Sequence, residues 1–451
     1  MGNTKTKASL FELDGIPAFG QALPLALQHV VAMIVGCVTP AIMISSAAGV
    51  SGADKVILIQ ASLVISALST LLQLFPIGKK NGFHLGSGLP VIIGVSFAYV
   101  PSMQAIAEGY DINTILGAQI IGGVVAGLVG IFIKKIRKFF PPLIAGTVVF
   151  TIGLSLYPTA INYMAGGVGS SDYGSMKNWL LAIFTLVVVT MQNHFGKGIF
   201  KLASILIGMA VGYVAAFFMG MVNFNSVAEA GIIQLPKLFH FPVRFEISAC
   251  FAIGLLFAIN AVQAIGDFLA TTSGGLGREP KTEELQGAIL GYGFTNIIGA
   301  CFGCLPTATY SQNVGIVTTT KVVNRCTLGL AAVVILVAGL FPKFSALLTT
   351  IPYAVLGGAT VSVFASIAMT GMKLVITEEM NYRNTSIVGL AAALGMGVSQ
   401  ASASLASFPA WVTTIFGKSP VVIATLVAIL LNITLPKEKV KIEVQEPNDV
   451  Y

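Results

Sequence analysis

The stretch Pro306–Lys321, PTATYSQNVGIVTTTK, is polar but lies between long apolar segments. Nine hydroxyl- or amide-bearing side chains fall within its sixteen positions, together with Gly315. At membrane depth, polar non-helical backbone is tolerated only where it is buried in protein or lines a water-filled cavity. The stretch therefore predicts a pore or a substrate pocket. The alternative is an ordinary polar loop between two spans.

The rest of the chain has the composition of a polytopic membrane protein. Of its 451 residues, 55% are hydrophobic and 10% are charged, and the mean hydropathy is +0.87. Soluble domains carry about 25% charged residues. Lys and Arg outnumber Asp and Glu by 25 to 18. That excess would suit a nucleic-acid partner, but the placement of the charges indicates a different cause.

Fourteen segments come near the length that crosses a bilayer, about 20 residues at 1.5 Å each. In order they are Pro24–Ser45, Val56–Phe75, Leu89–Met103, Ile115–Ile133, Leu143–Leu156, Trp179–Met191, Leu202–Met219, Ile247–Ala270, Gly287–Gly303, Thr309–Thr318, Leu328–Phe341, Val355–Met369, Ile387–Val398 and Val421–Leu435. With the N-terminus inside, the inner segments hold 19 of the 25 Lys and Arg residues. This bias predicts a cell-membrane protein with both termini in the cytoplasm, and it explains the basic balance without nucleic acid.

Two short segments interrupted by Gly and Pro recur at equivalent places. Gly88-Leu89-Pro90 precedes the third span, and Gly303-Cys304-Leu305-Pro306 precedes the tenth. They lie at equivalent places in two seven-span halves, and because seven is odd, the second half must enter the membrane from the opposite side. Paired short segments of this kind mark inverted-topology repeats and point to a transporter's binding site.

The repeat divides the chain into four parts. We expect a cytoplasmic N-terminal segment 1–22, a first repeat 23–225, a second repeat 226–436 and a cytoplasmic tail 437–451. The loop Met221–Glu246 is expected to join the two repeats.

Few ionisable residues lie inside the spans, and each is a functional candidate. Asp267 shares one face of the eighth span with Asn260 and Gln263, which precede it by seven and four positions. This carboxylate suits a coupling-ion site or a salt bridge within the bundle. His29, beside Gln28 in the first span, is either functional or a packing residue.

Other classes of function lack support in the sequence. The five cysteines are odd in number and lie mostly in apolar segments, so they do not form a disulfide framework. Cys301-Phe-Gly-Cys304 has the spacing of a redox or metal pair but no second pair, and helix packing is the favoured interpretation. We see no signal peptide, nucleophile–base pair, phosphate loop or HExxH motif. The sequence predicts no enzyme, no metal site and no cofactor.

Four motifs resemble those of the nucleobase–ascorbate transporter family, the nucleobase:cation symporters. Gln312-Asn313-Val314-Gly315, followed by Thr320-Lys321, is similar to the family's signature. Gln28-His29-Val30, Gly94–Tyr99 and Ala264–Asp267 resemble its motifs in the first, third and eighth spans. The four occur in the family's order and cover most of the chain.

The resemblance implies an all-α membrane protein of about 14 spans in two inverted seven-span repeats. Spans 1–4 and 8–11 would form a core domain, and spans 5–7 and 12–14 a gate domain. Spans 3 and 10 would be part extended and would meet at the substrate site. The implied activity is secondary active uptake of a purine nucleobase, such as xanthine or uric acid, by cation symport. Uracil or another small solute on the same fold, or a passive channel, are the alternatives.

The resemblance also implies roles for individual residues. Gln312 would bind the base through its amide, while Tyr99 and Ser311 would offer backbone groups, with the Tyr99 ring packed on the base. Asn313 would brace the tenth span, and His29 would support the polar network of the eighth. The family's uracil carriers tend to have Glu at this position and its purine carriers Gln, so the resemblance favours xanthine or uric acid over uracil. An amide supplies a donor and an acceptor, which suits an oxopurine edge with N–H beside C=O.

The sequence departs from the family's pattern at two positions. Gln263 stands where the family usually has a substrate-binding Glu linked to proton coupling, and Tyr292 stands where it usually has an Asp. Three possibilities follow: Asp267, with or without His29, couples transport to H⁺; another cation such as Na⁺ does so; or coupling is lost. A homodimer through gate helices such as that containing Gly357–Ala359 is a further expectation.

Overall fold

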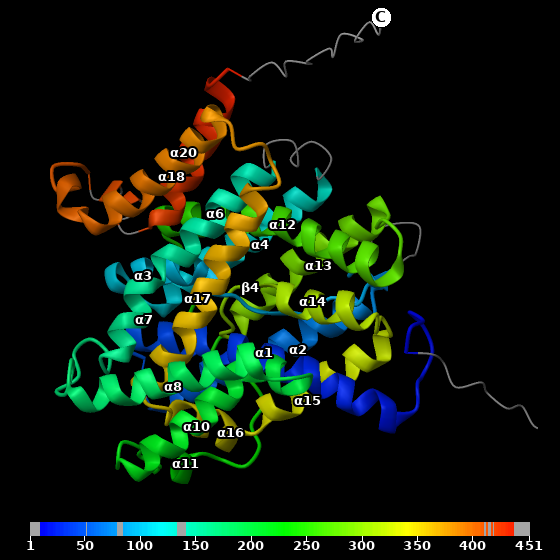
Figure 1. Cartoon of the computed structure of the whole chain (residues 1–451), viewed down its shortest axis with the longest axis vertical. Helices are drawn as coiled ribbons and strands as arrows, with labels where there is room; N and C mark the ends of the chain where they lie inside the picture. The colour runs from blue at the N-terminus through cyan, green and yellow to red at the C-terminus, as the bar shows by residue number, and fades with distance from the viewer. Residues whose placement is uncertain are drawn as a thin grey trace, which may run out of the picture.

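The computed structural model describes residues 10–50, 52–78, 84–132, 141–409, 412–413, 416–417 and 419–436. Figure 1 shows a helical bundle with a few short strands. Its helices are α1 (Phe19–Ala47), α2 (Gly52–Leu74), α3 (Val100–Gly109), α4 (Ile112–Ile131), α6 (Pro142–Ser155), α7 (Tyr157–Met164), α8 (Met176–Phe195), α9 (Ile199–Leu202), α10 (Ser204–Phe218), α11 (Asn225–Glu229), α12 (Ile247–Thr271), α13 (Thr282–Cys301), α14 (Ser311–Thr320), α15 (Arg325–Leu340), α16 (Pro342–Thr349), α17 (Tyr353–Val375), α18 (Tyr382–Gln400) and α20 (Pro420–Thr434). The strands are β1 (Ile77–Gly78), β2 (His84–Leu85), β3 (Ile93–Val95) and β4 (Thr307–Thr309), and short helical turns are η1 (Phe97–Tyr99), η3 (Thr272–Leu276) and η4 (Ser402–Leu405).

Each of the fourteen predicted spans corresponds to an element of the bundle. Among the described residues, seven helices are each long and apolar enough to cross a bilayer, or eight if α15 and α16, bent by 81°, count as one span. The remaining spans are shorter, less apolar or partly extended. The breaks that begin α7 and α16 fall at Pro158 and Pro342, since proline is favoured in the first turn of a helix and not within one.

The third and tenth spans are each a short strand that continues into a helix, as predicted. β3 pairs antiparallel with β4, with Ile93 opposite Thr309 and Val95 opposite Thr307. The Ser96 N–H donates to the Pro306 carbonyl at 3.0 Å and extends this ladder by one bond. The N-terminal ends of η1–α3 and α14 therefore lie on either side of one small, buried pair of strands.

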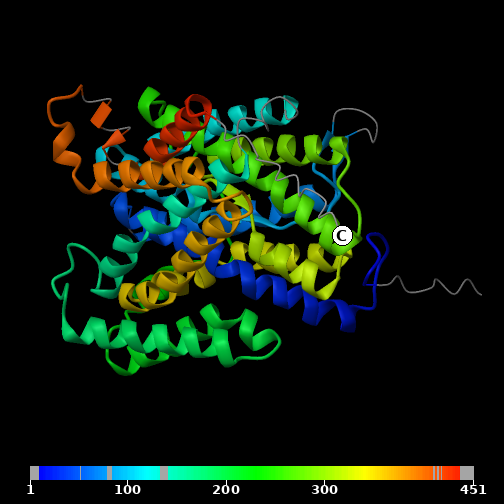
Figure 2. The same ribbon diagram turned by 45° about the horizontal axis from the view of Figure 1, so that its top comes forward.

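The helices pack as two bodies that match the predicted core and gate. In the core, α4 packs on α12 and α13, and α2 on α1, α13 and α15. In the gate, α17 packs on α6, α7, α8 and α10, and α18 on α6 and α20. Figures 1 and 2 show gate helices α7, α8 and α18 on one side of the bundle and core helices α14 and α15 on the other.

The small residues on α17 pack inside the gate, and the homodimer through gate helices stays a prediction. A Cβ at Gly357 would lie 2.3 Å from the Met164 backbone N of α7, and one at Gly358 would lie 2.3 Å from the Ala182 carbonyl of α8. Ala359 is fully buried as well. These residues let gate helices of the same chain approach closely, so the Gly357–Ala359 face is not available to a second copy.

The predicted linker contains one short helix, α11, that spans the proposed boundary between residues 225 and 226. The division into repeats at this position stays a prediction. All five cysteines are free, and no cluster of metal-ligating side chains occurs in the described part of the chain. The cytoplasmic tail predicted for 437–451 lies outside the described residues.

Candidate substrate-binding site

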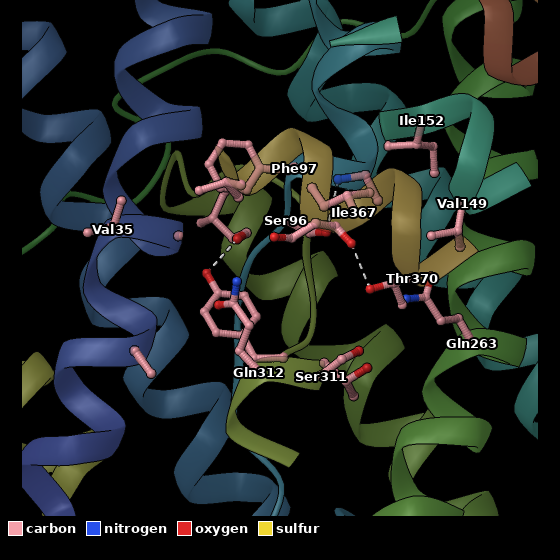
Figure 3. A pocket seen from close by; sticks show the side chains of 18 of the residues that line it. Val35, Ser96, Phe97, Val149, Ile152, Gln263, Ser311, Gln312, Ile367 and Thr370 are labelled. Carbon is pink, nitrogen blue, oxygen red and sulfur yellow. Dashed lines mark hydrogen bonds between the residues drawn. The ribbon is translucent and has the colours of Figure 1, made fainter. Parts of the chain in front are cut away.

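A cavity of about 290 Å³ lies between the core and the gate, beside the paired strands. Core residues from α1, β3, η1, α12, β4 and α14 line one part of it, and gate residues from α6, α10 and α17 line the other. Figure 3 shows Val35 and Gln312 of the core across the cavity from Val149 and Thr370 of the gate. The volume is near the lower end of that of small-molecule pockets.

Two amide side chains line this cavity from different spans. Gln263 comes from α12 and is half-buried, while Gln312 comes from α14 and is exposed to the cavity. Ser311 and Gln312 occupy the first turn of α14, whose N–H groups have no acceptor within the helix. The positive end of the helix dipole therefore meets the cavity and favours a ligand with carbonyl oxygens or negative charge.

Asp267 joins the eighth span to the tenth. Its carboxylate accepts hydrogen bonds from Thr309 Oγ1 at 2.5 Å and from Ser311 Oγ at 2.8 Å. The salt-bridge alternative is not found, because the ion pairs among the described residues do not include Asp267. Thr309 and Ser311 also line the cavity. A change in the charge of Asp267 would therefore change the hydrogen bonds of two side chains in the cavity wall.

His29 and Asn313 bind each other across α1 and α14. Asn313 Nδ2 lies 3.0 Å from His29 Nδ1 and 3.2 Å from the His29 carbonyl, and both side chains are buried. These contacts of His29 reach the tenth span, whereas the sequence prediction placed it in the network of the eighth. Asn313, which follows Gln312 in the chain, thereby holds the start of α14 against the first span.

Tyr99 does not lie where the sequence prediction placed it. Its side chain is fully buried, its hydroxyl bonds the Tyr292 hydroxyl, and its ring lies 4.8 Å from that of Phe257. Phe97, two residues earlier, lines the cavity in its place. The backbone here is a 3₁₀ turn, in which side chains two positions apart point about 120° away from each other. In a strand, by contrast, residues 97 and 99 would share a face.

Tyr310 is a cavity residue to which the sequence analysis gave no role. Its hydroxyl donates to the Val95 carbonyl at 2.6 Å and so braces β3 from the end of β4. Glycines make room for its ring: a Cβ at Gly36 or Gly94 would lie 2.8 or 2.7 Å from the phenol group. Its position beside Ser311 in the polar stretch Pro306–Lys321 was the feature of the sequence that could have indicated this role.

Ser366 and Thr370 were also missed. They stand four positions apart on α17, and both line the cavity from the gate. Their small hydroxyl side chains in an apolar helix are common packing residues in membranes, so the sequence alone did not distinguish them.

Comparison with known proteins places the chain in a family. Residues 20–404 match a family model described as the permease family. The chain is 36% identical over 419 residues to the uric acid permease PucJ of Bacillus subtilis, covering 91% of both proteins. It is 33% identical over 418 residues to the xanthine permease of Bacillus subtilis, covering 92% of this chain and 94% of that one. The chain is 32% identical over 444 residues to the xanthine permease XanQ of Escherichia coli K12, covering 95% of this chain and 94% of that one.

Solved structures agree on the fold. The transmembrane domain of the cyanobacterial bicarbonate transporter BicA aligns with a TM-score of 0.57 at 15% identity, over 92% of this chain and 98% of that domain. SLC26A9 aligns with a TM-score of 0.59 at 10% identity, over 91% of this chain and 64% of that one. At such identities the likeness shows the fold, two inverted repeats of seven spans. The chain belongs to the permease family of nucleobase–ascorbate transporters, and its members are transporters, not enzymes.

Proposed function

We propose that this protein takes up a purine nucleobase, xanthine or uric acid, across the cell membrane. The observation that carries the proposal is the convergence of Gln263, Gln312 and the N-terminus of α14 on one small cavity. An oxopurine presents N–H groups beside carbonyls, and each amide offers a donor and an acceptor. Relatives that bear the names of xanthine and uric acid permeases support the same substrate class.

The electrostatics of the cavity favour an oxopurine that is neutral or anionic. No lining residue in the described part of the chain is charged. Uric acid is largely the urate anion at neutral pH, and a carboxylate in place of Gln263 would repel it. Phe97 and Tyr310 add flat apolar surface to the cavity wall, which suits a planar ring.

We propose Asp267 as the group that couples transport to a cation. As a carboxylate it accepts from Thr309 and Ser311; once protonated it becomes a donor as well and a weaker acceptor, which weakens these bonds. The two hydroxyls stand on either side of Tyr310 in the cavity wall. Binding of H⁺ would thereby alter the shape of the site, and Na⁺ held by the same oxygens is the alternative.

Transport itself is proposed to occur by movement of the core against the gate. The cavity lies between these two bodies, so a shift of one against the other opens it to one side of the membrane and closes it to the other. We also propose cytoplasmic termini, on the distribution of Lys and Arg, and a homodimer through gate surfaces other than Gly357–Ala359.

Uptake of labelled xanthine and urate by cells lacking their own purine carriers tests the proposal. We expect concentrative uptake that a protonophore abolishes. Gln312→Ala should raise KM at least about tenfold, because it removes a donor and an acceptor inside the cavity. Asp267→Asn should abolish accumulation while exchange of labelled for unlabelled base continues. The matched control is Asp111→Asn, since Asp111 caps α4 and Asn caps a helix equally well.

The other outcomes of this assay are informative. Uptake that resists the protonophore but requires Na⁺ would mean that the coupling ion is Na⁺, and the rest of the proposal would stand. Uptake that never exceeds the external concentration and does not saturate would indicate a channel. Absence of xanthine and urate uptake, with uracil or another solute carried instead, would overturn the substrate.

A further inference from the structure

A second cavity of about 660 Å³, here called the far cavity, also lies between the core and the gate. Its wall combines core residues Ser46, Lys55 and Gln104 with gate residues Thr159, Asn162 and Tyr353. Among the residues that the structure describes, the two cavities share no lining residue.

The order of the two cavities is the same on a core helix and on a gate helix. On α1, Gly36 lines the substrate cavity, and Ser46 lines the far cavity about 15 Å further along. On α17, Ser366 lines the substrate cavity, and Tyr353 lines the far cavity about 20 Å away. The two cavities therefore follow each other along one path between the two bodies.

An aromatic contact joins the core and the gate beside the substrate cavity. The Phe97 and Phe364 rings lie 5.3 Å apart in an edge-to-face arrangement. Phe97 belongs to η1 of the core and lines the substrate cavity, while Phe364 is fully buried on α17, next to Val363, which also lines that cavity. The core and the gate are therefore in direct contact beside the substrate cavity.

A polar contact joins the same two bodies in the wall of the far cavity. The Tyr353 hydroxyl lies 2.5 Å from Ser46 Oγ. Since the Ser46 hydroxyl donates to the Ile42 carbonyl at 2.9 Å, the Tyr353 hydroxyl is the donor of this bond. Lys55 Nζ lies 3.4 Å from the same oxygen and 5.7 Å from the centre of the Tyr353 ring.

The other neighbours of Tyr353 belong to its own body. The Tyr163 ring of α7 lies 5.0 Å away, and a Cβ at Gly167 would lie 2.8 Å from the Tyr353 ring. Tyr353 is therefore fixed to the gate. A movement of the core would break its contacts with Ser46 and Lys55 but not its contacts with Tyr163 and Gly167.

We infer that the far cavity is the outer end of the transport path and that Tyr353, by its contacts with Ser46 and Lys55, closes the passage from this end to the substrate cavity in this conformation. The inference rests on the carrier function proposed above. The closing contacts are a neutral hydrogen bond and a distant cation–ring contact, which are weak enough to break in every transport cycle. Since Lys55 belongs to a predicted outer segment, the far cavity faces the outside.

The accessibility of a cysteine in the substrate cavity tests the inference. Ala32→Cys places a thiol in the wall of that cavity, which a reagent arriving from outside reaches only past the Tyr353–Ser46 contact, and a membrane-impermeant thiol reagent is applied to intact cells. The protein with its native cysteines alone gives the background. Tyr353→Phe, which keeps the ring and removes the hydroxyl, should speed modification of the introduced thiol about fivefold, as expected for the loss of one hydrogen bond. Ser46→Ala should do the same.

The matched control is Tyr173→Phe. It removes a tyrosine hydroxyl that donates to Asn162 Oδ1 at 2.8 Å, a bond beside the far cavity but contained within the gate. Its modification rate should equal that of the parent. Equal rates in all variants, an equal increase in Tyr173→Phe, or no modification even in Tyr353→Phe would overturn the inference. The assay needs no purine, so failure of the proposed substrate would not be mistaken for failure of the gate.

Discussion

At the scale of single residues, the site differs from its family pattern in where its charge lies. The amide of Gln263 leaves the described cavity wall uncharged, and the carboxylate of Asp267 lies behind it on the hydroxyls of Thr309 and Ser311. We thus propose different side chains, four positions apart on α12, for substrate recognition and for cation coupling. A wall of this kind does not repel an anionic ligand, whereas a carboxylate in contact with the ligand would.

The first residue-scale prediction concerns this amide. Gln263→Glu should raise KM for urate roughly tenfold, because two negative charges a few ångströms apart repel by more than about 1 kcal/mol even when partly solvated. The KM for xanthine, which is mostly neutral at pH 7, should change much less. Uptake kinetics of both bases measure the effect, with Gln400→Glu at the exposed end of α18 as the control for added charge. An unchanged KM for urate would refute the electrostatic argument.

At the scale of elements, the pairing of β3 with β4 holds the two half-spans in register. Three residues on each side pair, and Tyr310 adds a side-chain bond from one half-span to the other. So short a ladder is weak alone, since isolated two-stranded pairs are only marginally stable. The surrounding α1, α2 and α12 supply the remaining stability by packing against it.

The prediction at this scale tests the space that Tyr310 occupies. Gly94→Ala would place a Cβ 2.7 Å from the Tyr310 ring and 2.8 Å from Cys37 Sγ, so the strand or the ring must shift. We expect a loss of roughly 1–3 kcal/mol in stability, as for other overpacked sites, and a higher KM for the base. Gly389→Ala on α18 is the control, since a Cβ there meets nothing within 4 Å. Thermal unfolding in detergent and uptake kinetics are the measurements, and equal melting temperatures for the two variants would contradict the steric argument.

At the scale of the whole molecule, two cavities lie along a path between two bodies. The substrate cavity is bounded by core and gate together, and the Phe97–Phe364 contact and the Tyr353–Ser46 bond join the same two bodies. A relative movement of the core and the gate would therefore alter both cavities. Because the two repeats have the same fold in opposite orientations, the arrangement of one half in a given conformation can be adopted by the other half in a conformation open to the opposite side.

The whole-molecule prediction concerns orientation. Seven spans precede Ile232 and fourteen precede the end of the chain, so these two points should lie on opposite sides of the membrane. Alkaline phosphatase, which is active only outside the cytoplasm, should be active when fused after Ile232 and inactive when fused after the last residue. Green fluorescent protein should give the opposite result. Equal behaviour at the two positions would mean that the number of spans between them is even, and it would overturn the inverted repeat.

The sequence by itself determined the class of protein, the number and order of its spans, and the positions of the two half-spans, while the family resemblance implied that these meet at the site. It could do so because a bilayer requires long apolar segments and excludes exposed polar backbone, so each span carries its own local signature. The polar stretch Pro306–Lys321 and the positions of Gln263, Gln312 and Asp267 were visible for the same reason.

Tertiary structure alone decided which side chains face the cavity and which partners they have. Because residues 97–99 form a 3₁₀ turn and not a strand, the Phe97 side chain lines the cavity and the Tyr99 side chain does not. Because α1 packs against α14, His29 is hydrogen-bonded to Asn313. The bond between Ser46 and Tyr353 joins residues 307 positions apart. Hydropathy and spacing describe each segment separately, whereas these contacts depend on how segments rotate and meet, which is set by side-chain packing throughout the bundle.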